Sequence, residues 1–352
     1  MGLSNEGGSG VKAVELELSG RCNTHCLHCP REAITRPMGI MSPQVFETVS
    51  GKIVSARAFE AVYLSGMGEP TLNPHLVRFV TTLTPHFWVS LTTNAAALNA
   101  EKAEALRDAG LDAVYISFGG HTAALYGRMM GGLKFEKANQ RVREIVRVAG
   151  QQMRVSANVS VTPLTRPYLA EIEHHLQDLG VHDTVFAMCH SRGGYLSDCT
   201  ICDTPMPPLG QGRCDVFAET LYVAWDGQVL ACCHDLAAEG RVGDLVQERL
   251  ETILARKQRI VEEGVRFPMC ARCNDMYRFV QDPTPDRRPL SEWVYLLAQE
   301  DRHAALVDVV RRQEARIDSL EAEIAAYERG YLLRFANWLR RAKQRLHSVL
   351  GW

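Results

Sequence analysis

The sequence contains no run of about 18 consecutive apolar residues, the length that a membrane-spanning helix needs. Its first ten residues, MGLSNEGGSG, lack the basic and apolar stretches of a secretory signal peptide. It also lacks an excess of charge, because 39 Lys and Arg face 41 Asp and Glu, whereas nucleic-acid-binding proteins are normally basic. These absences predict a cytoplasmic protein without a nucleic-acid partner.

The chain is long enough for more than one domain. Its 352 residues, 46% hydrophobic and 23% charged, have ordinary globular composition. At about 100 to 200 residues per domain, we expect two or three domains. The sequence also has 11 cysteines. Because the cytoplasm keeps thiols reduced, we expect them to bind metal or act in catalysis rather than form disulfides.

Strand and helix patterns alternate in the first half of the chain. Short apolar, β-branched runs predict strands at residues 14–18, 61–65, 88–92, 113–118, 155–161 and 184–188. Apolar residues at three- and four-residue spacing predict helices at 43–56, 74–83, 100–109, 135–149 and 168–179. Six such units predict an α/β fold, a partial (β/α)6 TIM-like barrel over residues 12–190 with its active site at the carboxyl ends of the strands.

Three further regions follow the barrel. Gly and Pro residues predict a linker at 191–212, and a cysteine-bearing unit at 213–280 contains a hairpin around Asp226-Gly227. Residues 289–352 predict a helical tail, a heptad helix followed from Gly330 by a basic amphipathic helix. That pattern is typical of a helix that docks on a partner protein or on the inner face of the membrane. It is equally typical of a capping helix whose basic face is solvated.

Three cysteines share one loop after the first predicted strand. Cys22, Cys26 and Cys29 have C-x3-C-x2-C spacing. Thiolates bind zinc, copper(I) or iron–sulfur clusters, and His25 or His28 could supply the fourth ligand of a zinc site. The spacing alone therefore leaves the metal open.

This loop resembles the signature of the radical S-adenosylmethionine superfamily. The resemblance implies a 4Fe–4S cluster held by Cys22, Cys26 and Cys29, with S-adenosylmethionine on its open iron. It also implies a flavodoxin- or ferredoxin-type electron donor, and reductive cleavage to a 5′-deoxyadenosyl radical that abstracts a substrate hydrogen.

Further motifs of this family follow in order. Ser65-Gly66-Met67-Gly68-Glu69-Pro70 is similar to the GGEP segment, which implies that Gly66, Met67, Gly68 and Glu69 hold the methionine ammonium. Glycines let the backbone approach a ligand, and a carboxylate pairs with an ammonium. Met67 replaces the second glycine of the motif.

Four more positions are assigned to the cofactor by resemblance. Asn94 belongs to a TNG-like segment, and Ser117 stands where a polar ribose contact is frequent, although a turn Asn and a strand-end Ser fit equally well. Arg128 is assigned to the cofactor carboxylate, although Met130 occupies the position where Arg is expected. His28 could stack on the adenine or be a solvated loop residue.

A second set of cysteines lies in the region at 213–280. Cys214, Cys232, Cys270 and Cys273 could bind zinc or an iron–sulfur cluster. Their surroundings resemble the SPASM/twitch extension of radical enzymes. The shorter twitch form implies one auxiliary 4Fe–4S cluster on these four residues, with Cys233 as the alternative to Cys232.

The remaining thiols are candidates for hydrogen transfer to a substrate radical. We name Cys189, at the end of the sixth strand, and Cys233 as catalytic candidates; Cys199 and Cys202 are further thiols of this kind, and all four also fit inert roles. Because about ten residues precede the first strand, we expect a carbohydrate-like small molecule, oxidised or epimerised, rather than a peptide. A peptide-modifying maturase and a non-catalytic metal-binding interaction protein are the alternatives.

Overall fold

The computed structural model describes residues 10–198, 200–203 and 214–275. The predicted helical tail at 289–352, Cys199 and residues 204–212 of the predicted linker lie outside these residues. The chain divides into two units, of which the second, Leu297–Trp352, also lies outside them. Among the described residues, no helix is long and apolar enough to cross a membrane.

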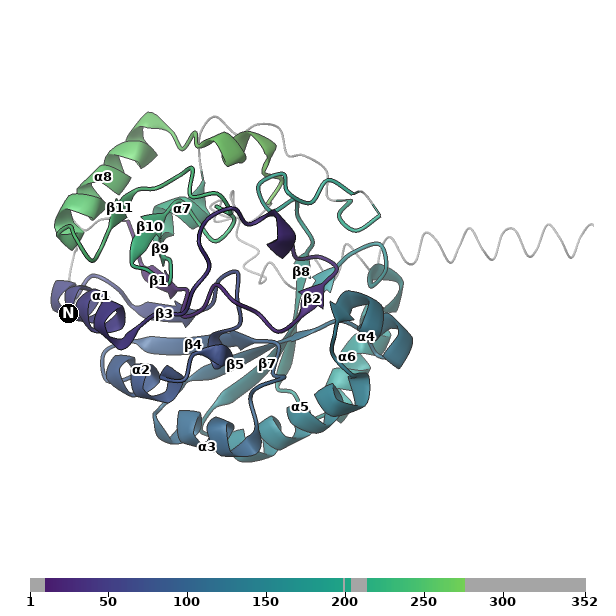
Figure 1. The fold of residues 1–352 in the computed structure, drawn as a ribbon. Helices are drawn as coiled ribbons and strands as arrows, with labels where there is room; N and C mark the ends of the chain where they lie inside the picture. The colour runs from purple at the N-terminus through teal and green to yellow at the C-terminus, as the bar shows by residue number, and fades with distance from the viewer. Residues whose placement is uncertain (1–9, 199, 204–213, 276–352) are drawn as a thin grey trace, which may run out of the picture. The chain divides into compact units, whose positions relative to one another are not determined.

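A single curved sheet forms the centre of the first unit (Figure 1). Its order is β11-β10-β9-β1-β3-β4-β5-β7-β8, and the six strands from β1 to β8 run parallel. These six are β1 (Ala13–Leu16), β3 (Ala61–Leu64), β4 (Trp88–Thr93), β5 (Ala113–Phe118), β7 (Arg154–Val161) and β8 (Asp183–Met188). The predicted α/β partial barrel is confirmed, with strand ends shifted by at most two residues.

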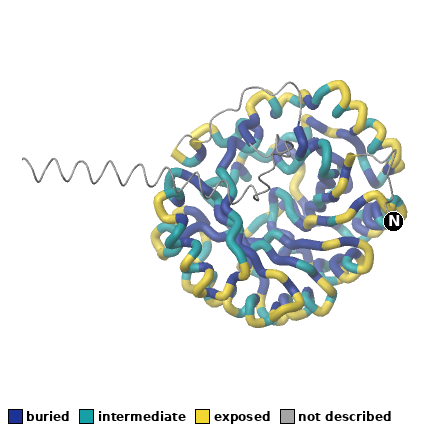
Figure 2. The backbone as a smooth tube through the Cα atoms, turned by 180° about the vertical axis from the view of Figure 1, so that it is seen from behind, coloured by how far each residue is buried: buried dark blue, intermediate teal, exposed yellow. Residues whose placement is uncertain are grey.

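Helices follow the parallel strands and lie around the outside of the sheet (Figure 1). They are α1 (Pro43–Ala56), α2 (Leu76–Leu83), α3 (Ala100–Asp108), α4 (Ala123–Met129), α5 (Phe135–Ala149) and α6 (Leu169–Asp178). In α1, the Ser42 side chain caps the helix by accepting from Val45 N, and Pro43 occupies the first turn. Phe46 and Ile53 are buried on one face. Figure 2 shows this burial continuing through the strands.

The second cysteine region extends the same sheet. β9 (Thr220–Val223) pairs parallel with β1, and β10 (Gln228–Leu230) and β11 (Gly243–Asp244) add antiparallel strands beyond it. Gly227 forms the predicted turn with a φ of 89°, a conformation that favours glycine. Helices α7 (Asp215–Glu219) and α8 (Leu250–Glu263) complete this region. Main-chain hydrogen bonds therefore connect it directly to the barrel.

Two short strands, not expected from the sequence, position the first cysteine loop. β2 (His25–Cys26) pairs antiparallel with β6 (Met130–Gly131), so that Cys26 lies opposite Met130. The strand β6 follows helix α4, which the sequence patterns also did not predict. This pairing ties the loop to the chain segment after β5.

Candidate active site

A cavity of about 650 Å³ opens at the carboxyl ends of the parallel strands. Most of the predicted site residues line it: Cys22, Cys26, His28, Cys29, Gly66, Met67, Gly68, Glu69, Asn94, Ser117 and Cys233. Residues up to 211 positions apart in sequence, Cys22 and Cys233, therefore meet at one place. Arg128 and Cys189 are not among the residues that line it.

Two of the three loop cysteines approach one hydroxyl group, and a main-chain hydrogen bond joins the third to them. Thr24 Oγ1 lies 3.2 Å from Cys22 Sγ and 3.5 Å from Cys26 Sγ, and Cys29 N donates to Cys26 O. Burial, together with negative charge on Cys29 and Cys22, raises the pKa of the Cys26 thiol to about 11. Three neighbouring thiolates of this kind need metal cations among them, because coordination deprotonates a thiol outright. This donor set fits the cluster that the sequence predicts.

The glycines of the turn at 65–70 allow it to pack closely. Gly66 has a φ of 151°, and a Cβ there would lie 2.8 Å from Glu17 Cγ. A Cβ on Gly68 would collide with the backbone oxygens of Ser19 and Arg21. The turn is therefore pressed against the start of the cysteine loop, to which Glu69 N also donates at 2.7 Å.

Glu69 is buried and fully hydrogen-bonded within the protein. Its Oε1 accepts from Thr71 N, Thr71 Oγ1 and Thr93 Oγ1 at 3.0, 2.5 and 2.6 Å, and its Oε2 accepts from Asn94 N at 2.8 Å. The carboxylate thus joins the short helix at Pro70–Leu72 to the end of β4 beside the cavity. The predicted contact with a ligand ammonium would have to share these oxygens.

Asn94 and His28 have different surroundings. Asn94 Nδ2 donates to Asn23 Oδ1 at 2.8 Å and lies 3.7 Å from Cys22 Sγ, so it holds the cysteine loop. Burial, followed by the charge of Arg192, lowers the pKa of His28 to about 4. Its buried Nδ1 has no hydrogen-bond partner among the described residues, which suits a ligand bound in the cavity.

Arg128 is exposed on α4, whereas Met130 lines the cavity with its Sδ 3.9 Å from Cys26 Sγ. Arg128, to which a cofactor role was assigned, therefore lies apart from the residues that line the cavity. The cavity instead contains Arg192, which sequence reasoning missed. Arg192 precedes Gly193 and Gly194, and φ values of 49°, 71° and 88° turn the chain back after β8. The Arg-Gly-Gly triplet was the available signal for a special turn.

Glu15 is the second cavity residue that sequence reasoning missed. It lies on β1, and its Oε1 accepts from Ser65 Oγ at 2.6 Å. Burial, and then the charge of Glu17, raise the pKa of Glu15, whereas Ser65, the charge of Arg192 and the nearby Cys233 thiol lower it. Glu17 follows β1 directly, so two acidic residues two positions apart in the apolar segment predicted as a strand at 14–18 were the available signal.

The second set of cysteines lies together beside the cavity. Burial raises the pKa of Cys232 well above its usual value, and the charges of Cys233, Cys214 and Cys273 raise it further. Cys214 immediately precedes α7, and Cys270 and Cys273 lie on one short turn, where Cys273 N donates to Cys270 O. Cys233 points to the cavity instead. This arrangement suits Cys232 as the ligand and leaves Cys233 available to a substrate.

Cys189 is buried away from the cavity lining. Its N–H donates to Val161 O, and Cys202 Sγ donates to its carbonyl oxygen at 3.2 Å. Burial raises the pKa of Cys189 to about 12. Of the described thiols outside the two predicted ligand sets, Cys233 is the one that lines the cavity.

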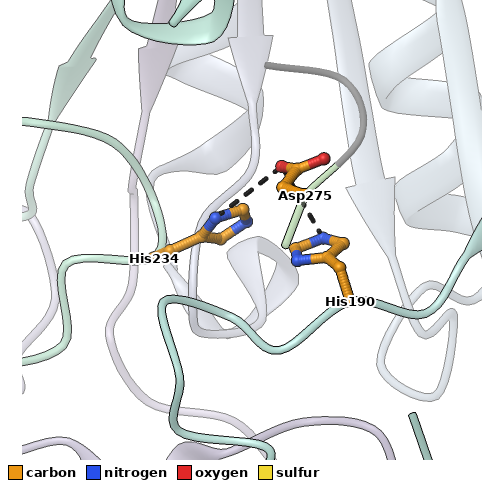
Figure 3. Close-up of side chains that lie close together, drawn as sticks. All are labelled: His190, His234 and Asp275. Atoms are coloured by element: carbon orange, nitrogen blue, oxygen red, sulfur yellow. Dashed lines mark ion pairs between the residues drawn. The ribbon is translucent and has the colours of Figure 1, made fainter. Parts of the chain in front are cut away.

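His190, His234 and Asp275 form a buried cluster next to this region (Figure 3). Asp275 Oδ2 lies 3.9 Å from His190 Nε2 and 3.8 Å from His234 Nδ1, and the two rings are 4.5 Å apart. These three atoms lie within 4.8 Å of one another, a spacing that a metal ion could bridge.

Hydrogen bonds from Arg192 argue against a metal ion there. Its backbone N–H donates to His190 Nδ1, and its NH1 lies against His234 Nε2, each at 3.3 Å. Arginine only donates, so both nitrogens must accept, and the one proton of each neutral ring lies on its other nitrogen. Those N–H groups face Asp275. We interpret the cluster as a polar network that joins the end of β8 to the two cysteine loops.

Comparison with known proteins agrees with this geometry. The profile of the radical SAM superfamily matches residues 16–179, and that of SPASM, an iron–sulfur cluster-binding domain, matches residues 214–274. The chain is 26% identical over 176 residues to the tungsten-containing aldehyde ferredoxin oxidoreductase cofactor-modifying protein of Pyrococcus furiosus. That alignment covers 49% of each sequence, so the chain spans about half the length of this relative.

Two solved structures share the fold. The structure of BtrN in complex with AdoMet and 2-DOIA has a TM-score of 0.54 at 17% identity, covering 78% of this chain and 97% of BtrN. Native anSMEcpe with bound AdoMet and Kp18Cys peptide has a TM-score of 0.57 at 14% identity, covering 84% and 98%. At such identities the likeness establishes the fold alone.

Proposed function

The chain belongs to the radical SAM superfamily and carries a C-terminal SPASM domain, and from this premise we propose that it epimerises a carbohydrate-like small molecule. The predicted cofactors are S-adenosylmethionine on a 4Fe–4S cluster and an auxiliary iron–sulfur cluster. When bound, the first of these supplies a 5′-deoxyadenosyl radical that abstracts a hydrogen atom. What decides the product is the group that the protein offers to the resulting substrate radical.

The position of Cys233 in the cavity is the observation that supports epimerisation. It lines the same cavity as Cys22, Cys26 and Cys29, and Glu15, whose pKa its thiol influences, lines that cavity too. An S–H bond is weaker than the C–H bond of an alcohol carbon, so Cys233 can donate a hydrogen atom to a carbon radical. The sulfur radical that remains then needs one proton and one electron. Glu15 is the adjacent proton source, and a flavodoxin- or ferredoxin-type protein is the electron source.

Glu15 also supports oxidation as a second candidate. Burial raises its pKa, so its carboxylate is a better base than an ordinary glutamate. It could accept the proton that a hydroxyl group loses when the substrate radical becomes a carbonyl, and an auxiliary cluster held by Cys214, Cys232, Cys270 and Cys273 would supply the electron acceptor. The two candidates differ in the mass of the product.

The test is turnover by anaerobically reconstituted enzyme with dithionite and S-adenosylmethionine in D2O, over a panel of nucleotide sugars. Epimerisation through Cys233 predicts 5′-deoxyadenosine and a product that gains one deuterium at carbon. Oxidation predicts loss of two hydrogens. Cys233→Ala should still form 5′-deoxyadenosine but no epimer, whereas Cys202→Ala, the buried control thiol, should behave as wild type. Deuterated epimer from Cys233→Ala would refute the assignment.

Peptide substrates form the control panel, since one structural neighbour carries a bound peptide. Turnover of peptides and not of sugars would replace the carbohydrate proposal with the peptide-modifying alternative. A cytoplasmic location, and contact of the basic stretch after Gly330 with a membrane surface or partner protein, are proposals from the sequence. Co-sedimentation with anionic vesicles tests that contact.

A further inference from the structure

Lys257 is a buried lysine that the proposed reaction does not use. It lies on α8 with 2% of its surface exposed, its Nζ donates to Phe217 O, and the same atom lies 3.6 Å from the centre of the Phe217 ring. No carboxylate among the described residues forms an ion pair with it. A buried ammonium is costly unless a negative group compensates it.

The negative groups near Lys257 are cysteines of the second set. Burial lowers the pKa of Lys257 to about 7, and the charges of Cys214 and Cys232 oppose that shift. Phe217 lies in α7, the helix that begins directly after Cys214. Lys257 is thus anchored to the helix that follows one predicted cluster ligand, Cys214, and the charge of a second, Cys232, also acts on it.

We propose that Lys257 is the charge partner of the auxiliary cluster, a positioning residue whose ammonium stabilises the reduced form. A 4Fe–4S cluster with four thiolates carries net negative charge, and reduction adds one more unit. A fixed cation in a buried site favours the more negative state, because charges interact strongly where water is excluded. Lys257 therefore raises the reduction potential. This inference rests on the assignment of the cluster to Cys214, Cys232, Cys270 and Cys273.

The test uses full-length protein in which Cys22, Cys26 and Cys29 are changed to Ala, so that the auxiliary cluster is the only one left. A potentiometric titration followed by electron paramagnetic resonance then gives its midpoint potential. Lys257→Met removes the charge at similar length, and Lys257→Arg retains it. Lys12→Met is the matched control, because the Lys12 side chain is 60% exposed.

We expect Lys257→Met to lower the reduced fraction at a fixed potential by about tenfold or more, which is 59 mV for a one-electron couple. Lys257→Arg and Lys12→Met should stay at the parent midpoint. Iron lost in Lys257→Met and restored in Lys257→Arg also supports the charge role. An unchanged midpoint with full iron, or iron lost equally in both variants, overturns it. A parent protein without iron would instead refute the auxiliary cluster itself.

Discussion

Removing the charge of Glu17 should destabilise the protein strongly. Glu17 is fully buried directly after β1, and Arg36 donates to its two oxygens at 2.8 and 2.6 Å. Tyr222 Oη and Met67 N also donate to it, at 2.7 and 3.1 Å. One carboxylate thus joins the chain after the cysteine loop, the turn at 65–70 and β9. The Arg36 side chain is only 4% exposed, so solvent cannot replace the carboxylate.

The magnitude follows from what each change leaves behind. Glu17→Gln leaves a buried guanidinium without an anion, which costs about 3 to 5 kcal/mol. Tyr222→Phe leaves the Glu17–Arg36 pair in place but removes two hydrogen bonds of the hydroxyl, the one it donates to Glu17 at 2.7 Å and a longer one that it accepts from Arg36 at 3.3 Å. The shorter bond to the charged group is worth about 1.5 to 3 kcal/mol. The double variant Glu17→Gln/Arg36→Met leaves no buried charge and should lose less stability than Glu17→Gln alone.

Urea unfolding of the anaerobic holoprotein measures these free energies. The reasoning is supported if Glu17→Gln loses more unfolding free energy than Tyr222→Phe and if the double variant recovers part of the loss. A loss below about 1 kcal/mol for Glu17→Gln would refute it, since surface ion pairs cost no more than that. Equal losses in the single and double variants would show that packing, not charge, holds the three segments together.

Three further changes test other parts of the site. Gly68→Ala should displace the cysteine loop and lower the iron content, because its Cβ meets the backbone of Ser19 and Arg21, whereas Gly51→Ala, with no atom within 4 Å of the added Cβ, should keep full iron. Cys26→Ala should abolish 5′-deoxyadenosine formation, and retained formation would contradict the assignment of the first cluster. Burial, followed by the charge of Arg192, lowers the pKa of His190. His190 therefore takes up a proton near pH 6.5 in the unfolded chain but stays neutral at that pH in the folded chain. Stability should therefore fall as pH decreases below about 6.5, and His190→Asn should flatten that fall in unfolding curves from pH 7 to 5.

The sequence predicts those elements whose signals are local. Helix α1 has the predicted bounds because Ser42 and Pro43 mark its start and an apolar stripe marks its buried face. The cysteine loop and the turn at 65–70 are also local, so their presence at the cavity is predicted from the order of strands and loops. The structure brings them together because carboxyl ends of parallel strands meet at one edge.

What the sequence does not predict depends on distant contacts. Nothing near Thr220–Val223 indicates pairing with β1, because its partner lies more than 200 residues earlier. Arg128 and Arg192 show the same limit. Resemblance assigned a cofactor role to Arg128, yet helix α4 presents it to solvent, whereas a turn stabilised by contacts with the second cysteine region brings Arg192 to the cavity. Glu69 is correctly placed, but its carboxylate is already occupied by protein donors.

The pairing of β9 with β1 means that the chain cannot be truncated between the barrel and the second cysteine region without exposing β1. β1 has a neighbour on each side, β3 and β9, along all four of its residues. A shortened chain that keeps only the barrel would leave one side of β1 bare, with its main-chain groups open to any passing strand. Such a fragment would tend to aggregate even if every loop cysteine were intact. The second cysteine region therefore covers the edge of the barrel at β1. We expect the solubility of the barrel, as well as its chemistry, to depend on this region.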